Sequence, residues 1–231
     1  MPTNHENLPP PHLPTSIQWI THIHALITHP LADVPFTAPD AQKRAYINTF
    51  ADEYANRRLT DRPFLAHLFN LTLDPPTTIN ALDQHLWWIV QSGNFDAHAA
   101  HTLIAPTGAL IPNSTNLAIE YRTMIELGAL HALWLIANRS NSSDLIARCF
   151  DAATWHTHEL QPDNAINRPW ATQVFIALSQ HSTDAQVAHL AHLHAQTLIH
   201  NACVNLAVPD ILSALILKDA ADQLTNDKPQ P

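Results

Sequence analysis

Residues 115–138 read TNLAIEYRTMIELGALHALWLIAN, and this segment decides the class of fold. Its commonest residues are leucine and alanine, which are both strong helix formers. Strand-like alternation of apolar and polar residues is hard to find in the rest of the chain. The chain contains only three glycines, which argues against folds built on tight turns, phosphate loops or dinucleotide fingerprints. The sequence therefore predicts an all-α protein.

Prolines and helix-capping residues divide the chain into about ten predicted helices. Side chains that can accept hydrogen bonds from first-turn amides mark several starts: Thr37, Asp61, Asn113 or Ser114, Ser142, Asn167 and Thr183. Short connections favour antiparallel neighbours, and so predict stacked helical hairpins in a bundle or a short α-solenoid. The predicted helices cover residues 15–29, 38–58, 62–73, 77–92, 95–105, 115–138, 142–160, 168–181, 183–205 and 209–226.

A single domain over residues 15–226 is the expected organisation. Apolar residues make up 46% of the chain and charged residues 13%, so the chain can bury a large core. Residues 1–14 and 227–231 are polar and proline-bearing, and we expect both tails to be poorly ordered.

Two segments that lie 106 residues apart resemble each other. Residues 61–69 read DRPFLAHLF, and residues 167–175 read NRPWATQVF. Self-similarity of this kind predicts a twofold repeat with halves 38–140 and 142–226, in which Phe69 and Phe175 occupy equivalent core positions. The alternative is that two unrelated helix starts have independently acquired the same common features: a capping residue, a first-turn proline and an apolar face.

The net charge restricts the classes of partner that the protein is expected to bind. The formal charge is −9 with the 17 histidines neutral, and no basic helix or zinc finger is visible, so nucleic acid is not expected as a partner. No secretory signal and no membrane-length apolar run is visible, which predicts a cytoplasmic protein without membrane contact. Cys149 and Cys203 form no CxxC pair, and therefore indicate neither a disulfide scaffold nor a zinc knuckle.

The richest polar stretch runs from residue 151 to residue 170, and Arg148 precedes it on the same predicted helix. A helix here places carboxylates, a histidine and a tryptophan on one face, and such groups can perform general acid and base chemistry beside an apolar wall. The alternative is a solvated helix face that runs into a capped loop. The candidate catalytic residues are Asp151, His158 and Glu159, and the candidate binding residues are Arg148, Trp155, Asp163, Arg168 and Trp170.

A second candidate is a histidine stripe on the predicted helix 183–205. His189, His192 and His200 share a face with Cys203, and imidazoles three residues apart can share a divalent metal. The helical metal motif HExxH is absent, so histidines packed between helices or facing solvent are the alternative. Apolar neighbours further predict that several of His131, His156, His189 and His192 are buried.

These observations favour a helical-repeat binding or scaffolding module whose partner is an unidentified protein or small molecule. The alternative is an enzyme with a carboxylate and histidine cleft, either metal-dependent or a sugar-active hydrolase or lyase.

Overall fold

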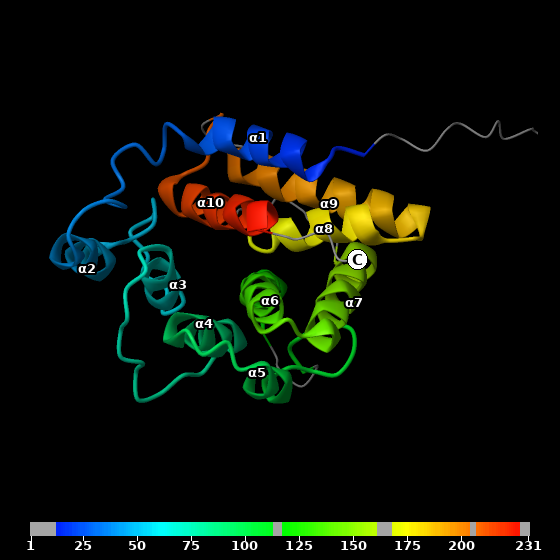
Figure 1. Cartoon of the computed structure of the whole chain (residues 1–231), viewed down its shortest axis with the longest axis horizontal. Coiled ribbons are helices and arrows are strands. Elements are labelled where there is room, and N and C mark those ends of the chain that lie inside the picture. The colour runs from blue at the N-terminus through cyan, green and yellow to red at the C-terminus, as the bar shows by residue number, and fades with distance from the viewer. Residues whose placement is uncertain (1–12, 113–116, 161–167, 204–206, 227–231) are drawn as a thin grey trace, which may run out of the picture.

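The computed structural model describes residues 13–112, 117–160, 168–203 and 207–226, and these ranges contain ten α-helices and no strand (Figure 1). The predicted all-α fold is confirmed. The helices are α1 (Ser16–Ile27), α2 (Asp40–Thr49), α3 (Asp61–Leu68), α4 (Leu82–Ser92), α5 (Ala97–Leu103), α6 (Ile119–Ser140), α7 (Ser143–Glu159), α8 (Thr172–His181), α9 (Ala185–Cys203) and α10 (Ile211–Asn226).

The helices pack as a bundle around α6. This helix contacts α4, α5, α7 and α8, and residues from Ile125 to Ala137 are buried along its whole circumference. A helix that is buried on all sides lies in the core of a bundle. Consecutive helices pair as α3 with α4, α6 with α7, and α8 with α9, while α1 lies along α10. Figure 1 shows α1, α8, α9 and α10 grouped together, with α3, α4 and α5 on the other side of α6.

The helix starts show why these residues form these helices. Ser142 accepts a hydrogen bond from the amide of Leu145, as predicted, and Thr15 forms a capping box with Gln18. The cap of α9 is Asp184, whose carboxylate accepts from the amides of Gln186 and Val187. The predicted cap Thr183 is therefore one residue too early.

The predicted helix 38–58 is wrong in its second half, because α2 ends at Thr49. Phe50 leaves the helical conformation with ψ 134°, and the Asp52 carboxylate then accepts from the backbone amides of Tyr54 and Asn56. Such local side-chain hydrogen bonds compete with helix formation. Residues 50–60 consequently form a loop, which becomes important for the site described below.

The twofold repeat is not confirmed. Arg62 and Pro63 lie in the first turn of α3, whereas Arg168 and Pro169 precede α8, which begins at Thr172 after Ala171 with φ +60°. The predicted cap residues 113, 114 and 167, residues 1–12 of the predicted N-terminal tail and the predicted C-terminal tail 227–231 lie outside the described residues. The matching phenylalanines are nevertheless both buried, with Phe69 2% and Phe175 0% exposed.

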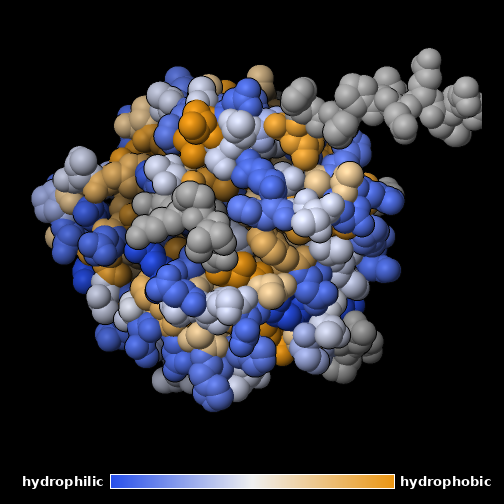
Figure 2. Space-filling view, turned by 45° about the vertical axis from the view of Figure 1, so that its right-hand side comes forward, coloured by the Kyte–Doolittle hydropathy of each residue, from blue (hydrophilic) through white to orange (hydrophobic). Residues whose placement is uncertain are grey.

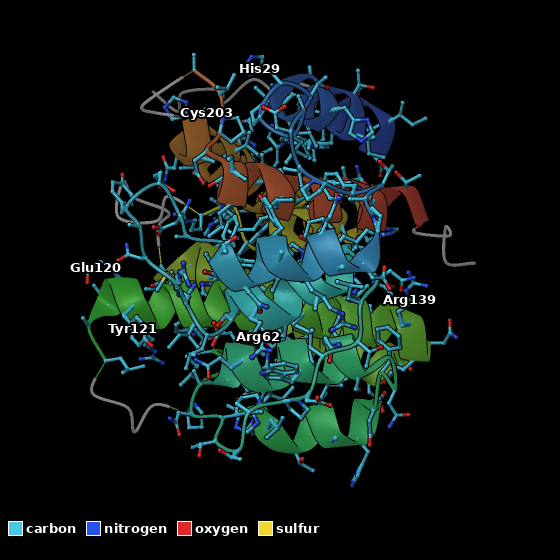
Figure 3. The ribbon with its side chains drawn as sticks, turned by 90° about the vertical axis from the view of Figure 1, so that its left-hand side faces the viewer. His29, Arg62, Glu120, Tyr121, Arg139 and Cys203 are labelled. Atoms are coloured by element: carbon cyan, nitrogen blue, oxygen red, sulfur yellow. The ribbon has the colours of Figure 1, made fainter. Side chains whose placement is uncertain are left out.

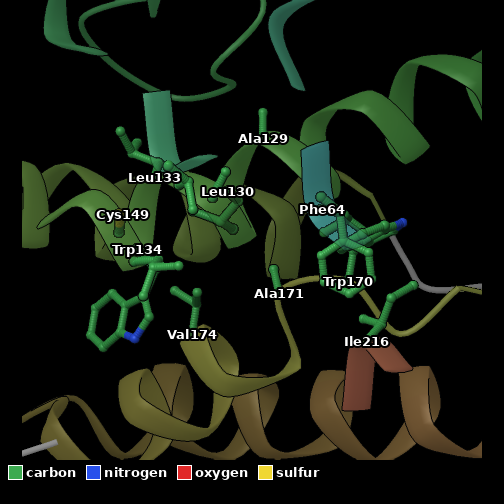
Figure 4. Packing of buried hydrophobic residues seen from close by; sticks show 14 of the residues in the cluster. Phe64, Ala129, Leu130, Leu133, Trp134, Cys149, Trp170, Ala171, Val174 and Ile216 are labelled. Atoms are coloured by element: carbon green, nitrogen blue, oxygen red, sulfur yellow. The ribbon is translucent and has the colours of Figure 1, made fainter. Parts of the chain in front are cut away.

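Aromatic rings from two helices and one loop meet in the core. Phe64 of α3 makes edge-to-face contacts with Trp87 of α4 at 5.0 Å and with Trp170 at 4.8 Å between ring centroids. In Figure 4, Trp170 and Phe64 lie together above Ile216 of α10. Such pairs add stability beyond the area they bury, so this cluster ties the two sides of the bundle together.

Polar groups in the core are held by specific hydrogen bonds. The Asp219 carboxylate lies 3.0 Å from His131 Nε2 and 3.3 Å from His67 Nε2, and it accepts from Gln223 at 2.6 Å. His131 Nδ1 accepts from the amide of Ala171, so Nε2 carries the proton that His131 donates to Asp219. Burial raises the pKa of Asp219, but the hydrogen bonds from His131 and His67 outweigh it and hold the pKa below its usual range.

The prediction that several of four histidines are buried is confirmed for His131, His156 and His192. The fourth candidate, His189, is exposed. The buried face of α9 includes Ala188, Ala191, His192 and Ala195, and His189 falls beside this face.

The surface mixes residue types. Figure 2 shows hydrophilic residues over most of one face, with hydrophobic residues exposed between them, which is normal for a folded protein. Among the described residues, no helix has the length and apolar character that crossing a membrane requires.

Candidate functional site

Three of the candidate site residues on α7 lie together at the loop that follows α5. The Arg148 guanidinium donates to the carbonyl oxygens of Ala105, Gly108 and Ala109 at 2.9–3.0 Å and to Asp151 at 3.1 Å. Asp151 in turn accepts from the amide of Gly108 at 3.0 Å. The polar groups of Arg148 and Asp151 therefore form hydrogen bonds with the loop after α5, and these bonds fix the conformation of the loop.

Trp155 covers the same loop. Gly108 has φ +64°, and a Cβ at this position would approach Trp155 Cδ1 to 3.2 Å, so the indole lies directly against the glycine. The indole also lines a cavity of about 270 Å³ beside the loop. The other catalytic candidates, His158 and Glu159, are exposed in the last turn of α7, and Asp163 lies outside the described residues.

The predicted metal ligands are not gathered into a site in the part of the chain that the structure describes. His189 and His200 are exposed, whereas His192 packs against the Trp19 ring with centroids 5.4 Å apart. In this part of the chain, no group of three or more His, Cys, Asp or Glu side chains is placed to hold a metal ion. Metal binding is therefore not confirmed.

Arg168 is a buried clamp between two segments. Its guanidinium donates to Asp210 at the start of α10 at 2.6 Å, and to Asp52 and Glu53 of the loop 50–60 at 2.9–3.1 Å. Only 6% of Arg168 is exposed. The other candidate from this segment, Trp170, is 1% exposed and lies in the aromatic core. Arg168 thus fixes the loop 50–60 to the body of the protein.

The loop that Arg168 holds forms one wall of a pocket of about 320 Å³. We call it the arginine pocket, because three arginines line it beside apolar residues from α2 and α4. Figure 3 views the molecule from the side of α2, α3 and α4, with Arg62 labelled on α3. The lining residues used below are Asn48, Phe50, Arg57, Arg58, Asp61, Arg62 and Trp88.

Each arginine has a different environment. Arg57 donates from Nη1 and Nη2 to the carbonyl oxygens of Asn48 and Thr49 at 3.1 and 3.2 Å, in the last turn of α2. These carbonyl groups carry only the partial negative charge of a helix C-terminus, so they compensate the positive charge of Arg57 in part. Arg58 is paired with the buried Asp83 at 3.2 Å. Arg62 is exposed and takes part in none of the ion pairs between described residues.

Asp61 lies among these arginines and is 4% exposed. Its Oδ2 accepts from the backbone amide of Arg58 at 3.0 Å, whereas its Oδ1 is buried without a hydrogen-bond partner. Burial raises the pKa of Asp61 to about 6, although the Arg58 hydrogen bond and the charges of Arg58 and Arg168 lower it. A carboxylate in this state is poorly stabilised at neutral pH.

Asp83 lies behind the pocket and is fully buried. Its carboxylate accepts from Arg58 and, at 2.7 Å, from Thr60, and burial raises its pKa. Asp83 packs against α6 at Gly128, where a Cβ would lie 3.4 Å from the Cβ of Asp83, which is an ordinary van der Waals contact. The three arginines of the pocket therefore face two carboxylates, and a positive excess remains.

The arrangement suits an anion with an apolar body. Guanidinium groups match carboxylate and phosphate oxygens in geometry and charge, and Trp88, 7% exposed, and Phe50 offer apolar contact. A cavity of about 320 Å³ is at the lower end of the range for small-molecule sites.

Sequence analysis did not single out these residues. A signal existed, because Lys43, Arg44, Arg57, Arg58 and Arg62 place five of the 11 basic residues within twenty positions. The predicted helix 38–58 placed Arg57 on a helix surface, and only the observed loop turns it toward Arg62. No protein-family model, curated protein or solved structure matches the chain. The functional interpretation therefore depends on the residues of the chain itself.

Proposed function

We propose that the protein is a binding module whose arginine pocket holds a small organic anion, made of a carboxylate or phosphate group on an apolar body. The observation that carries this proposal is the convergence of Arg57, Arg58 and Arg62 on one cavity.

The charge of the whole chain supports this proposal. With 20 acidic and 11 basic residues, most of the surface repels anions. An anion is attracted where positive charge gathers without full compensation, as it does at Arg57 and Arg62. The Arg168 clamp supports the pocket further, because a fixed loop presents Arg57 without a large entropy cost on binding.

The pocket favours binding over catalysis. Its described lining contains no serine, cysteine, histidine or lysine, and its one carboxylate, Asp61, is only 4% exposed and so has little access to a bound molecule. The enzyme alternative needs a different site, and Asp151 at the α5 loop is already engaged by Arg148 and Gly108. A cytoplasmic location and a helical-repeat origin remain predictions from the sequence.

The test is isothermal titration calorimetry with three aromatic probes: benzoate, phenyl phosphate and 2-naphthalenesulfonate. Benzyl alcohol serves as the uncharged comparison. We expect the anions to bind and benzyl alcohol not to bind, because the arginines supply most of the attraction.

A matched pair of variants locates the site. Arg62→Gln removes an exposed charge in the pocket, and Arg139→Gln removes an exposed charge near the end of α6 (Figure 3). Loss of one charge-assisted contact weakens binding about tenfold, so Arg62→Gln should do so and Arg139→Gln should not. Equal effects of the two variants, or no anion binding at all, would contradict the proposal.

A further inference from the structure

The carboxyl group of Asp61 is an unusual component of a pocket for anions. It is almost wholly buried, its Oδ1 has no hydrogen-bond partner, and it lies in the same lining as Arg57 and Arg62. A buried polar atom without a partner calls for an explanation. An ionised Asp61 would also repel the ligand that the arginines attract.

We propose that an anion entering the arginine pocket is taken up together with one proton, which Asp61 accepts on Oδ1. This inference rests on the proposed function. The proton comes from the buffer, and no other bond is made or broken. Oδ2 keeps its hydrogen bond from the amide of Arg58, so the backbone at the start of α3 does not need to move.

The charges around Asp61 explain why it is the group that responds. Arg58 and Arg168 lower its pKa, and Asp52 raises it, but the largest effect is burial, which favours the protonated form. Asp83 holds Arg58 from the side of α4, which reduces the charge that Arg58 offers to Asp61. The charged groups that face Asp61 or share its surroundings are Asp52, Arg57, Arg58, Arg62, Asp83 and Arg168.

Proton uptake and affinity are linked reciprocally. If the anion favours protonated Asp61, then protonation of Asp61 favours the anion by the same factor. Two like charges a few ångströms apart in a partly buried site repel enough to change affinity about tenfold. With the Asp61 pKa at about 6, affinity should rise about sixfold from pH 7.5 to pH 5.5.

The probe is 2-naphthalenesulfonate, because a sulfonate keeps the same charge over this pH range. Calorimetric titration at pH 6.5 and 0.15 M salt, in two buffers of different ionisation enthalpy, measures the protons taken up. We expect about half a proton per bound probe, because Asp61 changes from mostly ionised to mostly protonated.

Two variants isolate Asp61 from the titrating histidines. Asp61→Asn keeps an acceptor for the Arg58 amide and removes the titration, so proton uptake should vanish and affinity at pH 7.5 should rise severalfold. Asp144→Asn removes an exposed carboxylate on α7 and should behave as the wild type. Probe binding with the same proton uptake in wild type and Asp61→Asn overturns the inference and leaves the proposed function intact. Absence of probe binding in both overturns the proposed function. If Asp61→Asn does not fold, uptake below about 0.1 proton in the wild type overturns the inference.

Discussion

Acidification should destabilise the protein through two buried histidines. His156 is 0% and His194 3% exposed, and both ring nitrogens of His156 and the Nε2 of His194 are buried without hydrogen-bond partners. Burial lowers the pKa of each imidazole to about 3, and the charges of His194 and Arg122 lower that of His156 further. Both side chains are therefore neutral in the folded protein over the whole pH range of interest.

The sign and size of the effect follow from proton linkage. Each histidine of the unfolded chain binds a proton below pH 6.5, whereas the folded chain does not until about pH 3. Stability is present above the unfolded pKa and is lost as the pH falls below it. Between pH 7.5 and pH 5.5, each histidine lowers the free energy of unfolding by about 1.4 kcal/mol, and the pair by about 2.7 kcal/mol.

This magnitude does not depend on the folded pKa as long as that pKa lies well below 5.5. Asp61 acts in the opposite direction, because its pKa is about 6. Acidification to pH 5.5 protonates this buried carboxylate, and the loss of its charge stabilises the folded protein by about 0.8 kcal/mol. A comparison between variants cancels this contribution, together with those of the other carboxylates.

The perturbation is the double variant His156→Leu with His194→Phe, which keeps an aromatic ring on Phe175, 4.1 Å from His194. Urea denaturation at pH 7.5 and pH 5.5 gives the change in unfolding free energy for each protein. On acidification, the double variant should lose about 2.7 kcal/mol less unfolding free energy than the wild type does. The exposed control His98→Gln should match the wild type. Equal changes in the wild type and the double variant would refute the reasoning.

Three further predictions concern stability, measured by urea denaturation at pH 7.5. Asp61→Asn should stabilise by roughly 1–3 kcal/mol, because it removes a buried charge that is ionised at this pH; a loss of stability contradicts this. Arg168→Met should destabilise the protein by about 3 kcal/mol or more, because it leaves three carboxylates without their ion-pair partner. The exposed control Arg139→Met should change stability by less than about 0.5 kcal/mol, and an equally small change for Arg168→Met would show that the clamp does not stabilise the fold. Phe69→Ala and Phe175→Ala should each cost about 3–5 kcal/mol, and a small cost at either would contradict its place in the core.

The class of fold could be predicted because its signal is local. Segments such as residues 115–138 and the cap at Ser142 specify helices through propensity and neighbouring hydrogen bonds. Helix α7 appears where it was predicted, and α6 covers most of its predicted range but begins at Ile119. The end of α2 could not be predicted, since a helix pattern continued through residue 58 while Asp52 organised a loop instead. Local pattern and local hydrogen bonding compete there, and the second prevails.

The candidate site depends on contacts that one sequence does not display. Arg168 was expected to bind a ligand, but three carboxylates from two distant segments occupy it. Arg57 and Arg62 were not singled out, because they line the same pocket only through the loop 50–60 that Arg168 holds. Asp151 with Arg148 and Trp155 was correctly placed on one face of α7, yet that face engages the loop after α5.

The most direct test of the central claim is a crystal structure of the protein soaked with 4-iodobenzenesulfonate, with the iodine located by its anomalous scattering. Occupation of the arginine pocket predicts the strongest iodine peak beside Trp88 and Phe50, with the sulfonate oxygens within hydrogen-bond distance of Arg57 or Arg62. A strongest peak in the groove that Trp19 and His200 line between α1 and α9, or at the Trp155 cavity, with an empty arginine pocket, would contradict the account.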